Sequence, residues 1–148
     1  MNRHLGMLIT VGAVTVFGLL TAGTAASPKI MVENVWARPL PRVVESAELY
    51  MIIRNSGTDS DRLIVASSPA CGMVVLYERY RTSQGTMSMR ATRPIVIPAG
   101  KRVELNVNGH HLMCMERKRE FKAGVSLPLT LKFEKSGDVK VQLTVQNR

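Results

Sequence analysis

Side chains that bind soft metal ions are concentrated in residues 87–115. They are Met87, Met89, His110, His111, Met113, Cys114 and Met115. Thioether sulfur selects monovalent copper, and imidazole binds copper in either oxidation state. A set with little thiolate and no clustered carboxylates disfavours structural zinc, calcium and magnesium. The composition of this stretch therefore indicates a copper site.

Three of these residues have the spacing of an extended strand. Successive side chains of a strand point to opposite faces, so His111 and Met113 would leave the same face, with Met115 next along it. His110 would leave the opposite face. One strand would therefore supply two ligands, which is half of a typical site.

The elements that position these residues are predicted to be strands. Short segments rich in β-forming residues alternate with turn residues, and no segment has a convincing helical periodicity. The predicted strands are residues 29–38, 47–54, 61–66, 73–81, 87–90, 94–97, 103–107, 111–116, 127–133 and 139–145. This pattern predicts an all-β sandwich or barrel with one core. The large residues expected in that core are Trp36, Tyr50, Phe121 and Phe133.

Residues 1–26 are predicted to be a cleaved signal peptide. Arg3 precedes an apolar run from Met7 to Leu20, and the small residues 24–26 form a cleavage site. The run is short for a membrane span, so we expect export without a stable span after cleavage. The mature chain would then be one domain, residues 27–148.

The chain is basic, with a formal net charge of +9. An exported chain with mostly scattered Lys and Arg is not expected to bind nucleic acid. The charge favours either an acidic protein or anionic lipid partner, or a solvated surface with no specific partner. The sequence has no Gly-rich phosphate loop and no Gly-x-Ser-x-Gly, and the two histidines beyond the signal are adjacent. We therefore predict a protein that is not an enzyme.

The two cysteines, Cys71 and Cys114, leave three possibilities open. In an oxidising compartment an even pair suggests a disulfide. The two residues can instead be free buried thiols, or Cys114 can serve the metal or a redox reaction because it lies beside Met113. Spacing alone does not decide between these roles.

The predicted mature chain resembles the PCu(A)C-type periplasmic copper chaperones. The copper motif of that family is a His, ten residues, a Met, twenty-one residues and a His-x-Met. Here 21 residues separate Met89 from His111, and His111-Leu112-Met113 matches the His-x-Met. Further segments in the family's order are Val35-Trp36-Ala37-Arg38-Pro39, Ala47-Glu48-Leu49-Tyr50, Ile97-Pro98-Ala99-Gly100 and Leu127-Pro128-Leu129-Thr130. The resemblance implies a cupredoxin-like Greek-key β-sandwich that binds Cu(I) through Met89, His111 and Met113.

One position and one interval depart from the family motif, because 11 residues rather than ten precede Met89 after the first position. Val75-Leu76-Tyr77-Glu78 stands where the family has Glu-Leu-His-Glu, so Tyr77 replaces the first histidine. A phenol is hard and protonated near neutral pH, which makes it a poor ligand for Cu(I). We favour a three-coordinate metal. The residues that could add a ligand are His110, Met73, Met87 and Met115, together with Tyr77 itself as a poor ligand.

The resemblance also implies a function. It is that of a periplasmic carrier that hands copper to a cuproenzyme such as the copper centre of cytochrome c oxidase, with a thioredoxin-like copper chaperone as a further partner. Two alternatives stay open. The chain can have lost copper binding at Tyr77 and kept the fold as a binding or structural sandwich of the envelope. Less favoured is a thiol-disulfide assembly factor that uses Cys71 and Cys114, which lack the Cys-x-x-Cys spacing.

Overall fold

The computed structural model describes residues 25–92 and 94–148, and these residues form strands and no helix. The ten strands are β1 (Ile30–Ala37), β2 (Ala47–Asn55), β3 (Asp61–Ser67), β4 (Cys71–Arg81), β5 (Met87–Ala91), β6 (Ile95–Ile97), β7 (Arg102–Leu105), β8 (His110–Arg117), β9 (Ser126–Phe133) and β10 (Gly137–Val145). The predicted all-β class is therefore confirmed. Most of the predicted signal peptide, residues 1–26, lies outside the described residues. Within the described part of the chain, no helix is long and apolar enough to cross a membrane.

Each predicted segment corresponds to one strand, and turn hydrogen bonds explain the differences at the ends. β4 begins at Cys71 rather than Met73, directly after a turn in which the Cys71 N–H donates to the Ser68 carbonyl at 3.1 Å. β7 ends at Leu105 because the Asn106 N–H donates to the His110 carbonyl at 2.8 Å and begins the next turn. Alternation of apolar residues thus locates the strands, and local turns set their limits.

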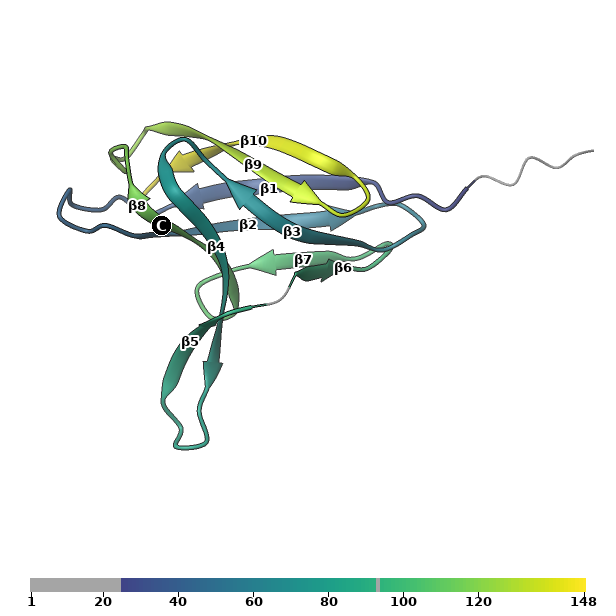
Figure 1. Cartoon of the computed structure of the whole chain (residues 1–148), viewed down its shortest axis with the longest axis horizontal. Coiled ribbons are helices and arrows are strands. Elements are labelled where there is room, and N and C mark those ends of the chain that lie inside the picture. The colour runs from purple at the N-terminus through teal and green to yellow at the C-terminus, as the bar shows by residue number, and fades with distance from the viewer. Residues whose placement is uncertain (1–24, 93) are drawn as a thin grey trace, which may run out of the picture.

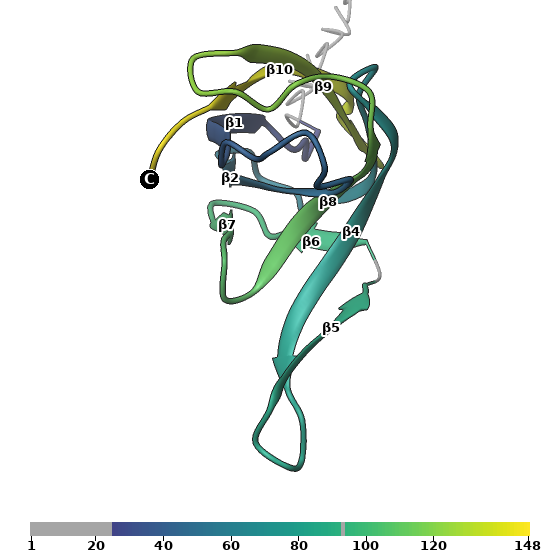
Figure 2. The same ribbon diagram turned by 90° about the vertical axis from the view of Figure 1, so that its left-hand side faces the viewer.

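The strands form one continuous sheet that closes on itself. Its order is β5-β4-β8-β2-β1-β10-β9-β3-β6, with β7 paired to β2. An additional pairing between β3 and β4 joins the two strands that lie next to the ends of this path, β5 and β6. β1 and β10 are parallel, and the other pairs are antiparallel. Figures 1 and 2 show β9 and β10 as a layer above β1 and β2, with β6 and β7 below β2, which confirms the sandwich.

The hairpin of β4 and β5 projects from this body in both views (Figures 1 and 2). One part of β4 pairs with β8 in the body, and its far end pairs only with β5. Tyr77 lies where the two pairings meet, because it is opposite both His111 on β8 and Ala91 on β5. The hairpin therefore carries Met89 away from the main core and toward one end of the β8 ladder.

The main core lies between the layers, and it contains two of the four aromatic residues predicted for it, Phe121 and Phe133. Tyr50, Phe121 and Phe133 are buried, whereas Trp36 is only half-buried. Neighbouring strand residues point to opposite faces, and Ala37 takes the inward position on β1. Trp36 instead packs on Tyr50, with ring centroids 4.7 Å apart, outside the main core.

Two buried polar side chains stabilise the loops at the end of the sandwich that holds β6. Asn55 Nδ2 donates to the carbonyls of Asp59 and Ile97, and its Oδ1 accepts the N–H groups of Lys29 and Gly57. Asp61 accepts three backbone N–H groups, at 2.8–2.9 Å. The donors are those of Arg62, Lys135 and Ser136. Every buried polar group of these two side chains is thus hydrogen-bonded.

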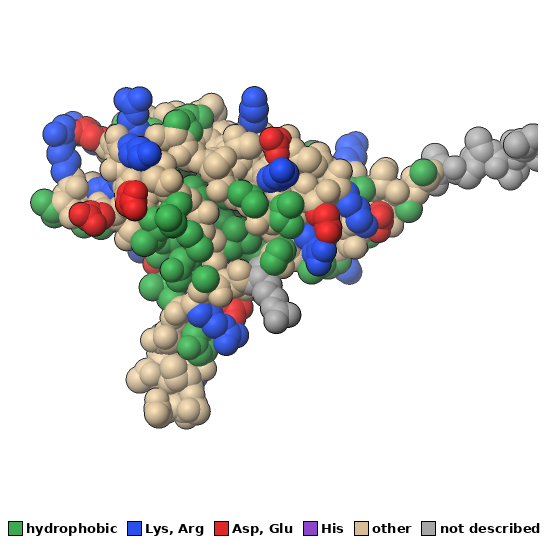
Figure 3. All heavy atoms as spheres, in the orientation of Figure 1, with side chains coloured by type: hydrophobic (Ala, Val, Ile, Leu, Met, Phe, Trp, Pro, Cys, Tyr) green, Lys and Arg blue, Asp and Glu red, His purple; other side chains and the backbone are tan. Residues whose placement is uncertain are grey.

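Hydrophobic side chains also reach the surface. Figure 3 shows them gathered over the middle of one face, where the hairpin joins the body, while Lys and Arg are spread along the upper edge, at both ends of the body and on the hairpin. Met73 on β4 and Val65 on β3 are among the large exposed hydrophobic residues, at 54% and 49%. Single exposed apolar residues are common, so this face alone does not identify a site.

Candidate metal site

The ladder between β4 and β8 sets the candidate ligands in rows. The rows are Tyr77 with His111, Val75 with Met113, and Met73 with Met115. Opposed residues of an antiparallel pair lie on the same face. Tyr77, His111 and Met113 therefore share one face of the sheet, as the alternation along β8 requires.

His111 is the buried polar residue on this face. Its side chain is fully buried, and Nδ1 lies 3.1 Å from the Gly109 carbonyl oxygen. A carbonyl can only accept, so Nδ1 carries the proton and Nε2 of the neutral ring has a free lone pair. Within the described residues, Nε2 has no hydrogen-bond partner. An imidazole whose Nδ1–H is held by a backbone carbonyl and whose Nε2 is free is arranged as metal-binding histidines usually are.

Tyr77 on β4 is directly opposite His111 on β8. The two rings are stacked, with centroids 6.2 Å apart and an angle of 24° between planes. A side chain at position 77 is therefore beside the imidazole, where a ligand from β4 would have to be. In this chain the position holds an aromatic ring that is stacked beside His111.

Met89 and Met113 line one open pocket. Its other lining residues are Arg38, Leu40, Ser46, Glu48, Tyr50, Arg79 and Val107. Met89 is 44% exposed and Met113 9% exposed, so one thioether is accessible and the other is nearly buried. His111 is not among the lining residues. The structure thus brings the two sulfur atoms to one pocket and keeps the imidazole buried two residues from Met113 along β8.

Arg79 is one of the two arginines that line this pocket, the other being Arg38. It lies opposite Met89 in the β4–β5 register, and its Nη2 is 3.6 Å from the Met89 sulfur. The same Nη2 donates to Glu48 Oε1 at 2.7 Å, and Nη1 donates to the Val107 carbonyl at 2.6 Å. The planar guanidinium fork allows these contacts at once.

Glu48 connects Arg79 to the second sulfur residue. It is opposite Met113 in the β2–β8 register, and it also accepts a hydrogen bond from the Tyr50 hydroxyl. Burial, followed by the hydrogen bond and charge of Glu48, raises the pKa of Tyr50 well above its ordinary value. The phenol therefore stays protonated and donates to the carboxylate at neutral pH.

The remaining candidates lie away from this pocket. His110 is on the opposite face of β8, with Nδ1 4.0 Å from the Glu78 carboxylate. Met87 is one step further out on β5, opposite Arg81. Met73 and Met115 face each other one row beyond Met113. The structure brings none of these four to the pocket that Met89 and Met113 line.

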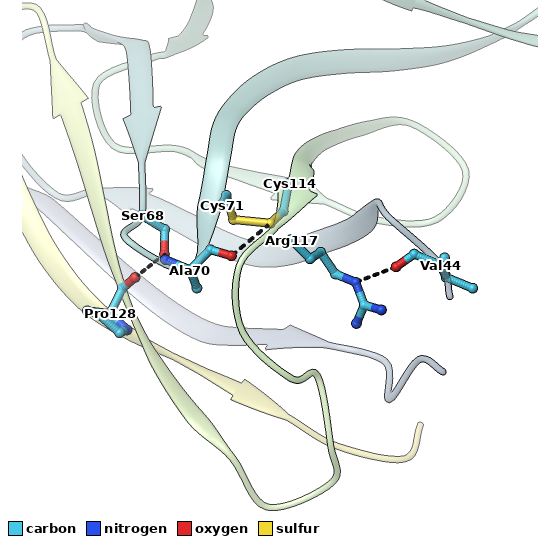
Figure 4. The surroundings of a disulfide bond; sticks show 7 residues. All are labelled: Val44, Ser68, Ala70, Cys71, Cys114, Arg117 and Pro128. Carbon is cyan, nitrogen blue, oxygen red and sulfur yellow. Dashed lines mark hydrogen bonds between the residues drawn. A yellow bond between two sulfur atoms is a disulfide. The ribbon is translucent and has the colours of Figure 1, made fainter. Parts of the chain in front are cut away.

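Cys71 and Cys114 form a disulfide, with Cα atoms 5.4 Å apart (Figure 4). Both residues are buried, at 5% and 0% exposure. Figure 4 places the bond between the start of β4 and β8, beside Ala70. Cys114 points to the face opposite His111, because it is an odd number of residues away on the same strand. The sulfur atoms therefore stabilise the ladder, and burial shields them from thiol exchange.

The donor chemistry of the site favours a soft cation. Among the described residues, no group of three or more His, Cys, Asp and Glu side chains could hold a metal ion. Such groups are typical of zinc, calcium and magnesium sites. Two thioethers and one imidazole instead suit Cu(I) and its soft analogues. The free Nε2 of His111 fits such a cation.

Sequence analysis missed the polar residues of the pocket. Glu48, Tyr50 and Arg79 were not predicted to be near the ligands. Glu48 and Tyr50 alternate on one face of a strand, and a carboxylate in an otherwise apolar strand is a signal for a buried partner. Nothing in the spacing of Arg79 indicates its contact with Met89, because that contact depends on the hairpin pairing.

These features describe a small all-β domain with a soft-metal donor set at one end. The chain belongs to the family described as "Putative lipoprotein LpqE-like", whose model matches residues 30–145. A relative in Leifsonia xyli subsp. xyli, "Putative lipoprotein Lxx21020", is 24% identical over 118 residues. The match covers 80% of this chain and 70% of the relative.

Solved PCuAC domains have the same fold. The copper-bound PCuAC domain from PmoF2 is 26% identical, with a TM-score of 0.68, over 84% of this chain and 97% of that one. The solution structure of Cu(I)-DR1885 from Deinococcus radiodurans is 26% identical, with a TM-score of 0.64, over 86% of this chain and 85% of that one. The predicted resemblance to PCuAC-type proteins is therefore supported by the fold, and both of these structures contain copper.

Proposed function

We propose that this protein is a non-enzymatic copper carrier that binds Cu(I) through Met89, His111 and Met113. The observation that carries the proposal is the buried Nε2 of His111, which has no partner among the described residues. An unsatisfied buried nitrogen costs about 1–3 kcal/mol, so its retention calls for a compensating function. Metal coordination satisfies the lone pair. The copper-bound PCuAC structures support the choice of metal.

The exposure of the three ligands suits a carrier. Met89 is the accessible donor, Met113 is nearly buried, and His111 is fully buried. Cu(I) would first meet the Met89 thioether and then the inner donors. Since His111 does not line the pocket, completion of the site requires the Tyr77 ring or the β5 segment to shift. Few soft ligands with one exposed member permit release by ligand exchange.

Tyr77 makes three-coordination the favoured state of the metal. Its phenol is beside His111 but is a hard, protonated group. His110 is on the opposite face of β8, so it does not replace the missing ligand. The alternative in which the fold is kept without copper binding predicts no retention of metal, which the titration below tests.

The recipient we propose is a copper protein of the envelope, such as the copper centre of cytochrome c oxidase, with a thioredoxin-like chaperone as a further partner. The basic composition, with 20 Lys and Arg against 11 Asp and Glu in the full sequence, favours docking to an acidic surface. Residues 1–26 would act as a cleaved signal that directs residues 27–148 to the periplasm. The lipoprotein relatives are consistent with an envelope location.

The test is a competition titration with Cu(I) under anaerobic, reducing conditions against a chromogenic chelator. We expect one equivalent to bind tightly to the native chain. His111→Ala should weaken binding by about two orders of magnitude or more, because it removes the nitrogen ligand. His110→Ala is the matched control, and we expect it to stay within about twofold, since its ring is on the other face.

A second pair of variants separates ligation from packing. Met89→Ala should weaken binding, whereas Met31→Ala should not, although the two methionines have similar exposure of 44% and 48%. Failure of the native chain to retain copper, or equal binding by His111→Ala and the native chain, would contradict the proposal.

A further inference from the structure

The pocket between the two sulfur residues already contains a cation. The Arg79 guanidinium lies 3.6 Å from the Met89 sulfur and 2.7 Å from the Glu48 carboxylate. Glu48 is the residue opposite Met113. Arg79 thus stands between the accessible thioether and the carboxylate beside the inner thioether.

This placement is unusual for an ordinary surface ion pair. The Arg79 and Glu48 side chains are 26% and 27% exposed, so solvent screens their charges only partly. A thioether is a weak hydrogen-bond acceptor and gains little from a guanidinium donor. The contact does, however, place a positive charge at the atom that a Cu(I) ion would use.

A bound Cu(I) ion and the guanidinium would repel each other. Met and His ligands are neutral, so the metal keeps its full positive charge inside the pocket. Glu48 is the acidic side chain among the pocket residues, which also include the cations Arg38 and Arg79. It accepts hydrogen bonds from Arg79 and from the Tyr50 hydroxyl. Removal of the guanidinium from Met89 would leave Glu48 to balance the incoming cation.

We propose that Arg79 is a cation placeholder of the metal-free site, and that its displacement from Met89, with Glu48 left facing the metal, sets the affinity for Cu(I). The inference rests on the proposed function, because it assigns two further residues to the same site. Both act through charge and position and do not ligate the metal. A purely structural ion pair would not give effects of opposite sign on metal affinity.

The experiment measures Cu(I) and Ag(I) affinity of the full mature chain by competition, with thermal unfolding as a check on folding. We expect Arg79→Gln to raise the affinity about tenfold and Glu48→Gln to lower it about tenfold. Arg79→Lys keeps the charge and should bind less tightly than Arg79→Gln. Arg81→Gln is the matched control, because it removes the same charge from the same face of β4 without contact to Met89; it should change affinity less than about threefold.

A measurement on the native chain needs no variant. Addition of Ag(I) should shift the side-chain 15N–1H resonance of Arg79 and leave that of Arg62 unchanged. Arg62 is paired with Glu134 away from the pocket and serves as the internal control.

The outcomes separate the two proposals. Native binding with an Arg79→Gln affinity that is equal or lower would overturn the placeholder and leave the carrier intact. An Arg81→Gln effect as large as that of Arg79→Gln, or an Arg79 resonance that does not move, would also overturn it. Binding by both proteins, with Arg79→Gln about tenfold tighter than the native chain, would support it. Absence of binding by both folded proteins would overturn the carrier and the placeholder together.

Discussion

Buried polar side chains have all their hydrogen-bond partners at one place in this sandwich and lack one at another. Among the described residues, three polar side chains are buried: Asn55, Asp61 and His111. Asn55 and Asp61, at the end that holds β6, have partners for their buried polar atoms. His111, on β8 near the hairpin, has a nitrogen with none. Asn55 and Asp61 stabilise the fold, whereas the Nε2 lone pair of His111 is free to bind a group from outside the chain.

The largest expected effect is on stability, at the end of the sandwich that contains Asn55 and Asp61. Asn55→Ala leaves two N–H groups and two carbonyls without their side-chain partner and should lower the free energy of unfolding by about 3–4 kcal/mol. Chemical denaturation measures this loss. The exposed Asn147→Ala is the control and should change stability by less than about 0.5 kcal/mol. A small loss for Asn55→Ala would mean that the polar network is not structural.

The next largest effect is on metal affinity, at the site around His111. Tyr77→His places an imidazole beside His111, where the phenol now stacks, and should tighten Cu(I) binding about tenfold or more. Tyr77→Phe keeps the ring without the hydroxyl and should bind like the native chain. Competition titration compares the three proteins. Equal affinity of Tyr77→His and the native chain would show that position 77 does not reach the metal.

A smaller effect on stability is expected when His111 is replaced by an apolar side chain. His111→Leu removes the unpartnered Nε2, which favours stability, and also removes the Nδ1 hydrogen bond to the Gly109 carbonyl, which opposes it. Because these two effects oppose each other, the free energy of unfolding should change by less than about 1 kcal/mol while copper binding is lost. Denaturation and titration of the same sample give both values. A stability loss as large as that of Asn55→Ala would place His111 with the structural residues instead.

The last prediction concerns the pH dependence of stability that the ionisation of Asp61 produces, which appears in acid and not near neutral pH. Burial opposes ionisation, but the side-chain hydrogen bond of Ser136 and the backbone N–H groups outweigh it, so the pKa of Asp61 is below its ordinary value. The stability that the carboxylate contributes is therefore present above the unfolded pKa, and it is lost as pH falls through the lower folded pKa. Below about pH 4, native stability should fall more steeply than that of Asp61→Asn.

The control for this pH dependence is the exposed Asp138→Asn, whose stability curve should run parallel to that of the native chain. Stability curves of the native chain and Asp61→Asn that are parallel between about pH 5 and pH 2 would contradict the assignment.

The sequence predicted the strands and the shared face of His111 and Met113, because both follow from alternation along one chain. His111 and Met113 share a face for that reason, and turn residues mark where strands end. The contact of Arg79 with Met89 could not be predicted in this way, since it depends on the β4–β5 register and on side-chain conformation. Nor could the inward position on β1 be assigned to Ala37 rather than Trp36, because alternation does not say which face is buried.

The central claim is that the free nitrogen of His111 is the inner ligand of a soft metal. The most direct measurement is the 15N spectrum of the His111 ring during titration of the mature chain with Ag(I), a redox-inert analogue of Cu(I). We expect the Nε2 resonance to shift and couple to silver, with Nδ1 still protonated toward Gly109, while the ring of His110 is unchanged. A His111 Nε2 resonance that does not change at saturating Ag(I) would contradict the account.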